Sequence, residues 1–203
     1  MTNQPLKLER ILAHYRRGFR ARADAHILVD LCSIKRIPSY QETPLLDWGE
    51  YIPMITGCVH RQMREYSHLV PPSVFDFFNE TKNEPIFPPV SERNRNLINE
   101  AARLSEARLH PQYAKKSESA DNVDLLGFPD TQMISYAMDR AREDEQTIIV
   151  SDDGGILKTL SHLRKKSPER KAFHPNMFSF GIRNFVEEIY PQFRGQVSPY
   201  IIP

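Results

Sequence analysis

Short runs rich in hydrophobic residues occur at three places in the chain, at 25–31, 147–151 and 176–180. Their length and their content of branched aliphatic and aromatic residues are typical of strands buried on both faces of a parallel sheet. A further short strand is predicted at 51–56, after a stretch rich in turn residues. The chain therefore supplies at least four candidate strands, widely separated in sequence.

Hydrophobic residues at helical spacing alternate with these strands. Helices are predicted at 5–22, 57–66, 73–81, 91–110, 130–143, 154–165 and 182–190. Strand–helix alternation implies a parallel sheet with right-handed crossovers. We predict one α/β domain over 1–203, a three-layer α/β/α sandwich around a four- or five-stranded parallel sheet. The polar region 68–127, which is rich in helix-breaking residues, is expected to be a helical and loop insertion or lid within this domain.

Four aspartates occupy the places where strands end and helices begin. Asp30 ends the first run, Asp130 opens a predicted helix, and Asp152 and Asp153 follow the run at 147–151. Each alone is compatible with an ordinary turn or helix cap. Together they would meet at the carboxyl edge of the sheet, where α/β proteins build their sites. Carboxylates gathered there repel one another unless a cation or a proton neutralises them, so the pattern predicts a metal site.

The predicted ligands are all carboxylate oxygens, which suits Mg²⁺ or Mn²⁺. Phosphoryl chemistry is the natural use of such a site, because the metal can activate a water and neutralise charge on a departing oxygen. No HExxH or HxH spacing indicates zinc, and no Gly-rich loop ends in Lys-Ser/Thr, which excludes a P-loop nucleotidase.

Charge adds little to this interpretation at the level of the whole chain. The 203 residues carry a net charge of +1, with 40% hydrophobic and 26% charged residues, which is ordinary for a globular protein. Any attraction for nucleic acid must therefore be local. The basic runs are 15–22 and 164–166, the latter followed by Arg170 and Lys171.

The two cysteines and the absence of long apolar runs bear on the compartment. Cys32 and Cys58 follow predicted strands and are interpreted as small buried hydrophobic residues in a reducing compartment. The sequence contains no signal peptide and no apolar run of membrane-spanning length. A cytoplasmic protein without a membrane partner is expected.

Four segments together resemble the PIN-domain nucleases: ILVDLCSI (27–34), FPDTQMISYA (128–137), IIVSDDGGILK (148–158) and MFSFGIRNFVEEI (177–189). The resemblance covers most of the chain outside 68–127. It implies a Mg²⁺- or Mn²⁺-dependent endoribonuclease that acts on single-stranded or structured RNA. Members of this family include toxins of toxin–antitoxin pairs and ribosomal-RNA processing factors, and many dimerise. A homodimer, and an antitoxin-like or RNA-processing protein partner, are therefore implied as well.

Carried over by position, the resemblance assigns roles to individual residues. Asp30 is similar to the first acid of the family and Asp130 to the third. Asp153 is similar to the acid of the Ser/Thr-x-Asp signature. These three aspartates would hold the metal, and Asp152 would assist. Ser151 would hydrogen-bond one of the metal-binding carboxylates at the substrate site.

The second acidic position of the family is not matched. The family usually has a glutamate in the helix after its second strand, and the corresponding position here is Gln62. Glu65 lies one turn further on, rotated by about 60° on the helix, and is the candidate replacement. Contacts with the RNA backbone are expected from Gln62 and from four cations, Arg61, Arg64, Lys158 and Arg164.

Two other functions remain open at the level of sequence. A PIN-like scaffold that binds RNA or a protein without cutting it is compatible with the neutral Gln62. A receiver-like or phosphatase-like domain would use Asp30 as a phosphoacceptor. A haloacid-type phosphatase, however, has an aspartate where Cys32 stands, and a receiver has its acidic pair before the phosphoacceptor strand.

Overall fold

The computed structural model describes residues 19–20, 22, 25–35, 54–70, 72–79, 85–112 and 123–189. The helix predicted at 5–22 and the basic run 15–22 lie outside these ranges except for Phe19, Arg20 and Arg22. Residues 113–122 of the 68–127 region and the first three residues of the strand predicted at 51–56 also lie outside them. The three apolar runs and the four aspartates all lie within the described part of the chain.

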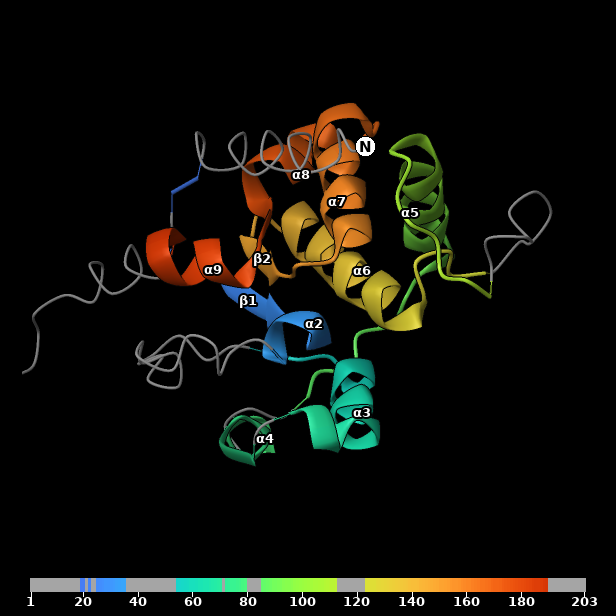
Figure 1. Cartoon of the computed structure of the whole chain (residues 1–203). Coiled ribbons are helices and arrows are strands. Elements are labelled where there is room, and N and C mark those ends of the chain that lie inside the picture. Colours follow the sequence, from blue (N-terminus) through green and yellow to red (C-terminus); the bar gives the residue numbers. More distant parts are fainter. Residues whose placement is uncertain are drawn as a thin grey trace, which may run out of the picture.

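The described residues form a parallel sheet of three strands (Figure 1). The strands are β1 (His26–Val29), β2 (Thr147–Val150) and β3 (Met177–Phe180), in the order β1-β2-β3. Val29 lies opposite Val150, which lies opposite Phe180. The side chains of β2 and β3 are all buried, as their mainly apolar sequences predicted. The three strands therefore end together at one edge.

The strand predicted at 51–56 appears within the described residues only as isolated bridges. Met54 forms a parallel bridge with Leu28, and Thr56 forms one with Ile86. The Met54 N–H donates to the Ile27 carbonyl at 2.7 Å, and its carbonyl accepts from the Val29 N–H at 3.0 Å. This segment therefore runs beside β1, on the side away from β2. The fold is a mixed α/β structure, and a sheet of four or five strands within three layers stays a prediction.

Three long helices cover the sheet and one another. They are α5 (Glu92–Leu104), α6 (Phe128–Arg142) and α7 (Gly154–Lys166). Helix α6 packs against β2 and β3, α7 packs against β3, and α5 packs against α6 and α7. Figure 1 shows α5 beyond α6 and α7 as seen from the strands. The 68–127 region therefore contributes at least one helix that packs against the helices covering the sheet.

The remaining elements are short. They are α2 (Leu31–Ile34), α3 (Gly57–Glu65), the 3₁₀ turn η2 (Ser67–Leu69), α4 (Pro72–Asn79), α8 (Arg170–Asn176), α9 (Ile182–Asn184) and the π-helical turn η4 (Phe185–Ile189). Helices α2 and α8 have no counterpart among the predicted elements, because four to seven residues carry little periodicity. No helix in the described ranges combines the length and the apolar content needed to cross a bilayer.

Two helix boundaries differ from the predictions for local reasons. The helix predicted at 91–110 begins as expected, since the Ser91 side chain accepts a hydrogen bond from the Asn94 N–H, but it ends at Leu104. Glu106, two residues on, has a φ of 54°, which is incompatible with a continuing right-handed helix. Helix α6 begins two residues earlier than predicted, after Gly127 at a φ of 100°.

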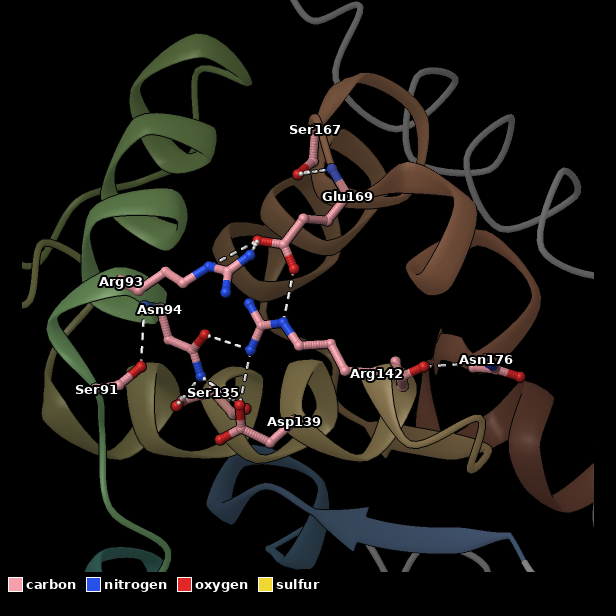
Figure 2. Close-up of polar contacts among 10 residues, drawn as sticks. Ser91, Arg93, Asn94, Ser135, Asp139, Arg142, Ser167, Glu169 and Asn176 are labelled. Carbon is pink, nitrogen blue, oxygen red and sulfur yellow. Dashed lines mark hydrogen bonds and ion pairs between the residues drawn. The ribbon is translucent and has the colours of Figure 1, made fainter.

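A polar network joins α5, α6 and the start of α8 (Figure 2). The Arg142 guanidinium donates to Glu169 Oε2 at 2.6 Å, to Asn94 Oδ1 at 2.7 Å and to Asp139 Oδ1 at 2.7 Å. Arg93 of α5 donates to the other Glu169 oxygen at 3.1 Å. Arg142 therefore connects all three helices. Its hydrogen bond holds the pKa of Glu169 below its ordinary value, against the opposing effect of burial.

Candidate acidic site at the carboxyl edge of the sheet

Asp30 is held at the end of β1 by its own backbone. Its N–H donates to the Val150 carbonyl at 3.0 Å, and its carbonyl accepts from the N–H groups of Ser33 and Ile34 at 3.0 Å each. The residue thus ends the β1–β2 pairing and starts α2 at the same time. Its side chain makes no hydrogen bond that caps α2, and only 4% of the residue is exposed. The carboxyl group is therefore buried at the edge of the sheet.

Ser151 connects the ends of two strands. Its hydroxyl donates to Asp30 Oδ2 at 2.9 Å and accepts from the Asp153 N–H at 3.0 Å. Ser151 itself is fully buried. The hydrogen bond expected between Ser151 and a neighbouring carboxylate is therefore present, and it places the backbone of Asp153 close to the side chain of Asp30.

Asp153 is the N-cap of α7. Its Oδ1 accepts from the N–H groups of Gly155 and Ile156, the latter at 3.3 Å. A Cβ at Gly155 would lie 2.9 Å from this oxygen and 3.1 Å from the Arg108 carbonyl, so glycine permits the tight turn. The second carboxylate oxygen of Asp153 accepts no hydrogen bond from the described residues and is available to a ligand.

Asp130 lies in the first turn of α6, which Gly127 precedes as the N-cap residue. Asp130 is therefore not the N-cap residue, which was the alternative interpretation of its position in the sequence. Its half-buried carboxyl group accepts no hydrogen bond from the described part of the chain. Burial raises the pKa of Asp130 well above its ordinary value, and the charges of Asp30 and Asp153 raise it further. The three aspartates predicted as metal ligands thus lie close enough to influence one another.

The same electrostatic effect acts on Asp30. Burial raises its pKa from 3.8 to about 6, and the Asp153 charge adds to this effect, whereas the Ser151 hydrogen bond lowers it. No lysine or arginine is among the causes of the pKa shifts of Asp30 and Asp130. Two carboxyl groups are therefore desolvated beside a third, and the described residues supply no cation among the causes of their pKa shifts. A proton or a bound cation would relieve the repulsion.

The donor chemistry fits a hard divalent cation, but the cluster is open. Among the described residues, no three His, Cys, Asp or Glu side chains are grouped closely enough to hold a metal ion. Mg²⁺ usually keeps several waters and takes only one or two carboxylates from the protein, so an open cluster of oxygens remains compatible with it. Asp30, Asp130 and Asp153 are the residues that would hold such an ion. We refer to these three aspartates as the acidic cluster.

Cys32 lies beside the acidic cluster. This proximity was not predicted from the sequence. Cys32 is exposed, so the expectation of a buried hydrophobic residue is wrong. Although the residue is exposed, partial desolvation of its thiol and then the charges of Asp30, Asp153 and Asp130 raise its pKa to about 12. The available signal was its position in sequence, two residues after Asp30 and at the start of a helix.

Asp152 and Glu65 are placed differently from the acidic cluster. Asp152 Oδ1 accepts from the Ile182 N–H at 3.3 Å, at the start of α9. Glu65 is exposed at the last residue of α3, whereas Gln62 is half-buried one turn earlier. Neither Asp152 nor Glu65 is among the charges that raise the pKa of Asp30, Asp130 or Cys32.

The four cations predicted to contact RNA occupy three different settings. Arg61 and Arg64 are exposed on α3, and the Lys158 ammonium donates to the Glu106 carbonyl at 3.0 Å. Arg164 is 3% exposed. Its guanidinium donates twice to the His174 carbonyl, at 2.6 and 3.1 Å, and lies 4.5 Å from the centre of the Phe178 ring. This geometry favours a structural role for Arg164 over contact with a substrate.

The structure thus brings Asp30, Asp130 and Asp153 together with Ser151 at one edge of the sheet. It places Asp152 against α9 and Arg164 at the opposite end of α7. An acidic cluster of this kind can bind a cation and, through it, a phosphate group. No family model, no curated protein and no solved structure matches the chain.

Proposed function

We propose that this protein is a Mg²⁺- or Mn²⁺-dependent endoribonuclease of PIN type, which hydrolyses phosphodiester bonds of single-stranded RNA. The observation that carries the proposal is the convergence of Asp30, Asp130 and Asp153 at one sheet edge, where no lysine or arginine of the described residues is among the causes of the Asp30 and Asp130 pKa shifts. Unneutralised carboxylates at a strand edge disfavour folding. Their presence together is explained if a cation binds there.

The roles of the acids follow from their surroundings. Asp30, Asp130 and Asp153 would hold the metal, which when bound would supply an activated water and neutralise charge on the leaving oxygen. Ser151 would orient the Asp30 carboxylate and keep it ionised, because its hydrogen bond lowers the pKa of that group. Asp153 would present one oxygen to the metal while the other caps α7.

Other residues would position the substrate. The exposed Arg61 and Arg64 on α3 would attract the phosphate backbone of an RNA strand. Gln62, which is half-buried and lies between them in sequence, could donate a hydrogen bond to a phosphate or ribose oxygen. Lys158, in the second turn of α7, could contact another phosphate of the same strand. A neutral Gln62 removes one charge from the family pattern and would weaken metal binding.

The proposal of a PIN-type fold also leads to an expectation about the number of strands in the sheet. In a PIN-type fold, the segment at 54–56 would be a strand beside β1, and the segment at Ile86 would lie beyond it. The bridges Leu28–Met54 and Thr56–Ile86 support this order. The sheet would then have four or five parallel strands between two helical layers.

Cleavage of a 5′-labelled, mixed-sequence single-stranded RNA tests the proposed activity. The reaction is run with Mn²⁺, with Mg²⁺ and with EDTA, and the double variant Asp30→Asn/Asp153→Asn is run alongside to reveal contaminating nuclease. We expect metal-dependent cutting that the double variant lacks. Gln62→Glu and Glu65→Gln then test the second acidic position, and an increase in activity with the former would support it. Equal cutting by the wild type and the double variant would refute the proposal.

A PIN-like scaffold that binds RNA without cutting it is the second candidate. It is favoured by the open spacing of the acidic groups in the described residues and by the neutral Gln62. The two functions differ in their response to metal. A scaffold would bind RNA equally well with Mn²⁺ and with EDTA, would show no Mn²⁺-induced change in Tm, and would leave the RNA intact.

A further inference from the structure

A basic hollow of about 640 Å³ lies between the end of α7 and α8. Its lining consists of Arg164, Lys165, Arg170, Lys171, His174 and Pro175. Every lining side chain except that of Pro175 is a cation or a base, and no acidic residue is among them. The hollow is therefore a concentrated positive surface on a chain whose net charge is only +1.

Three cations that line this hollow make no ion pair with the described part of the chain. Lys165, Arg170 and Lys171 are exposed, and none of them takes part in an ion pair within the described residues. Glu169, the acid next to Arg170 in sequence, is bound instead to Arg93 and Arg142 (Figure 2). Crowding of like charges costs free energy, which a bound polyanion would recover.

Arg164 joins the two helices that line the hollow. Arg164 is buried there, and its guanidinium is fixed by two hydrogen bonds to the His174 carbonyl and by the Phe178 ring. These hydrogen bonds join α7, which carries Lys165, to α8, which carries Lys171. Lys165 is exposed, but partial desolvation and then the charges of Arg164 and Lys166 lower its pKa, in agreement with a crowded basic surface.

The basic hollow is separate from the acidic cluster. Asp153 caps the first residue of α7, whereas Arg164 and Lys165 lie in its last turn. A helix of this length spans about 18 Å at 1.5 Å per residue. Figure 1 shows α8 at the top of the molecule and α2, which follows Asp30, below the strands. The two sites therefore lie at opposite edges of the sheet.

We propose that the basic hollow binds the phosphate backbone of single-stranded RNA, at a second site distinct from the acidic cluster. The choice of RNA over another polyanion rests on the proposed nuclease function. A stacked strand carries one phosphate per about 3.4 Å, so about five nucleotides would span the distance between the two sites. One RNA strand would then be anchored at the hollow while a distant phosphodiester reaches the acidic cluster.

Binding of a labelled 12-nucleotide single-stranded RNA in EDTA tests this site without cleavage. The wild type is compared with Arg170→Ala/Lys171→Ala and with the charge-preserving control Arg170→Lys/Lys171→Arg. We expect the alanine variant to bind the RNA several-fold more weakly. The slope of log K against log[salt] should also be less steep by about 1.4, because two phosphate contacts are lost and each contributes about 0.7 to the slope. The control variant should keep both the affinity and the salt dependence.

Three outcomes would overturn the proposal. The first is an alanine variant with the affinity and salt dependence of the wild type, and the second is a wild type that binds no RNA. The third is displacement of the RNA by polyglutamate as effectively as by unlabelled RNA, which would indicate an acidic protein as the ligand. Arg61→Ala/Arg64→Ala serves as a reference for binding near the acidic cluster.

The binding test and the cleavage test fail separately. Wild-type binding that depends on Arg170 and Lys171, without metal-dependent cutting, would leave the RNA site in place and refute the nuclease. Normal cutting and unchanged binding in the alanine variant would refute the RNA site alone. Because Arg170 and Lys171 are exposed, their replacement should leave the Tm within the range of ordinary surface substitutions.

Discussion

The Ser151 hydroxyl donates a hydrogen bond of 2.9 Å to Asp30 Oδ2, which joins residues 121 positions apart at the ends of two neighbouring strands. Both groups are buried, so the bond is shielded from water. It stabilises the ionised form of Asp30, whose pKa is raised by burial and by the Asp153 charge. Ser151 thus sets how readily Asp30 can act as a carboxylate.

Ser151→Ala should therefore weaken the binding of a cation. Loss of the hydrogen bond raises the pKa of Asp30 further and costs about 1 kcal/mol or more of stability. We expect a smaller Mn²⁺-induced rise in Tm at pH 7 than in the wild type. Ser179→Ala is the matched control, because Ser179 is equally buried and its hydroxyl bonds the Ile149 carbonyl instead of a carboxylate. An equal Mn²⁺ response in both variants would contradict this role.

The raised pKa of Asp30 predicts a pH dependence of stability in EDTA. Between pH 3.8 and about 6, folded Asp30 retains a proton that the unfolded chain has lost, so its contribution to stability falls as the pH rises through this window. The loss amounts to about 3 kcal/mol at 1.36 kcal/mol per pKa unit. The Asp30→Asn variant, whose side chain stays neutral, should not show this loss of stability.

Urea unfolding of the wild type and Asp30→Asn from pH 4 to pH 7.5 measures this effect. The free energy of unfolding of the variant, relative to the wild type, should increase from pH 4 to pH 6 and then level off. The variant should also lose the Mn²⁺-induced rise in Tm. A difference that is constant across the pH range would show that Asp30 has an ordinary pKa.

Two substitutions at Asp153 separate its role as a helix cap from its charge. Asparagine is also a good N-cap, so Asp153→Asn should keep the stability of the protein in EDTA. Asp153→Ala removes the acceptor for the Gly155 and Ile156 N–H groups and should cost about 1 kcal/mol. Both variants should lose the Mn²⁺ response. Retention of that response in Asp153→Asn would exclude this residue as a metal ligand.

Arg142 is predicted to be essential for the stability of the helical layer. Arg142→Ala leaves Glu169, Asn94 and Asp139 without their shared donor, and we expect a loss of about 2 kcal/mol or more. Arg183→Ala is the control. Its pairing with Glu187 is exposed and should contribute less than about 0.5 kcal/mol. Chemical denaturation of both variants at pH 7 makes the comparison.

Because of the lowered pKa of Glu169, the destabilisation caused by Arg142→Ala should depend on pH. Since its pKa lies below the ordinary value, Glu169 contributes stability that is present at neutral pH and lost as the pH falls through the folded pKa. The stability difference between the wild type and Arg142→Ala should therefore shrink in acid. A difference that is unchanged at low pH would mean that packing of the arginine, and not its ion pair, stabilises the layer.

The three strands were predictable because each is a short, mainly apolar segment, and such segments are a local property of the sequence. The starts of α3, α5 and α7 were predictable as well, from polar N-cap residues and apolar spacing. The early end of α5 and the early start of α6 were not, because they depend on the positive φ angles of Glu106 and Gly127. The strand predicted at 51–56 appears in the described residues only as isolated bridges, because strand pairing depends on the neighbouring segment as well as on local sequence.

The sequence by itself determined that Asp30, Asp130 and Asp153 stand at the ends of strands or in the first turn of a helix, because local periodicity fixes where elements begin and end. Only the tertiary structure decided that their charges act on one another, that Asp152 faces α9, and that Arg164 is buried. It also placed Cys32 beside the acidic cluster and Lys165, Arg170 and Lys171 around one hollow. Desolvation and charge proximity depend on which distant segments pack together, and periodicity carries no information about that.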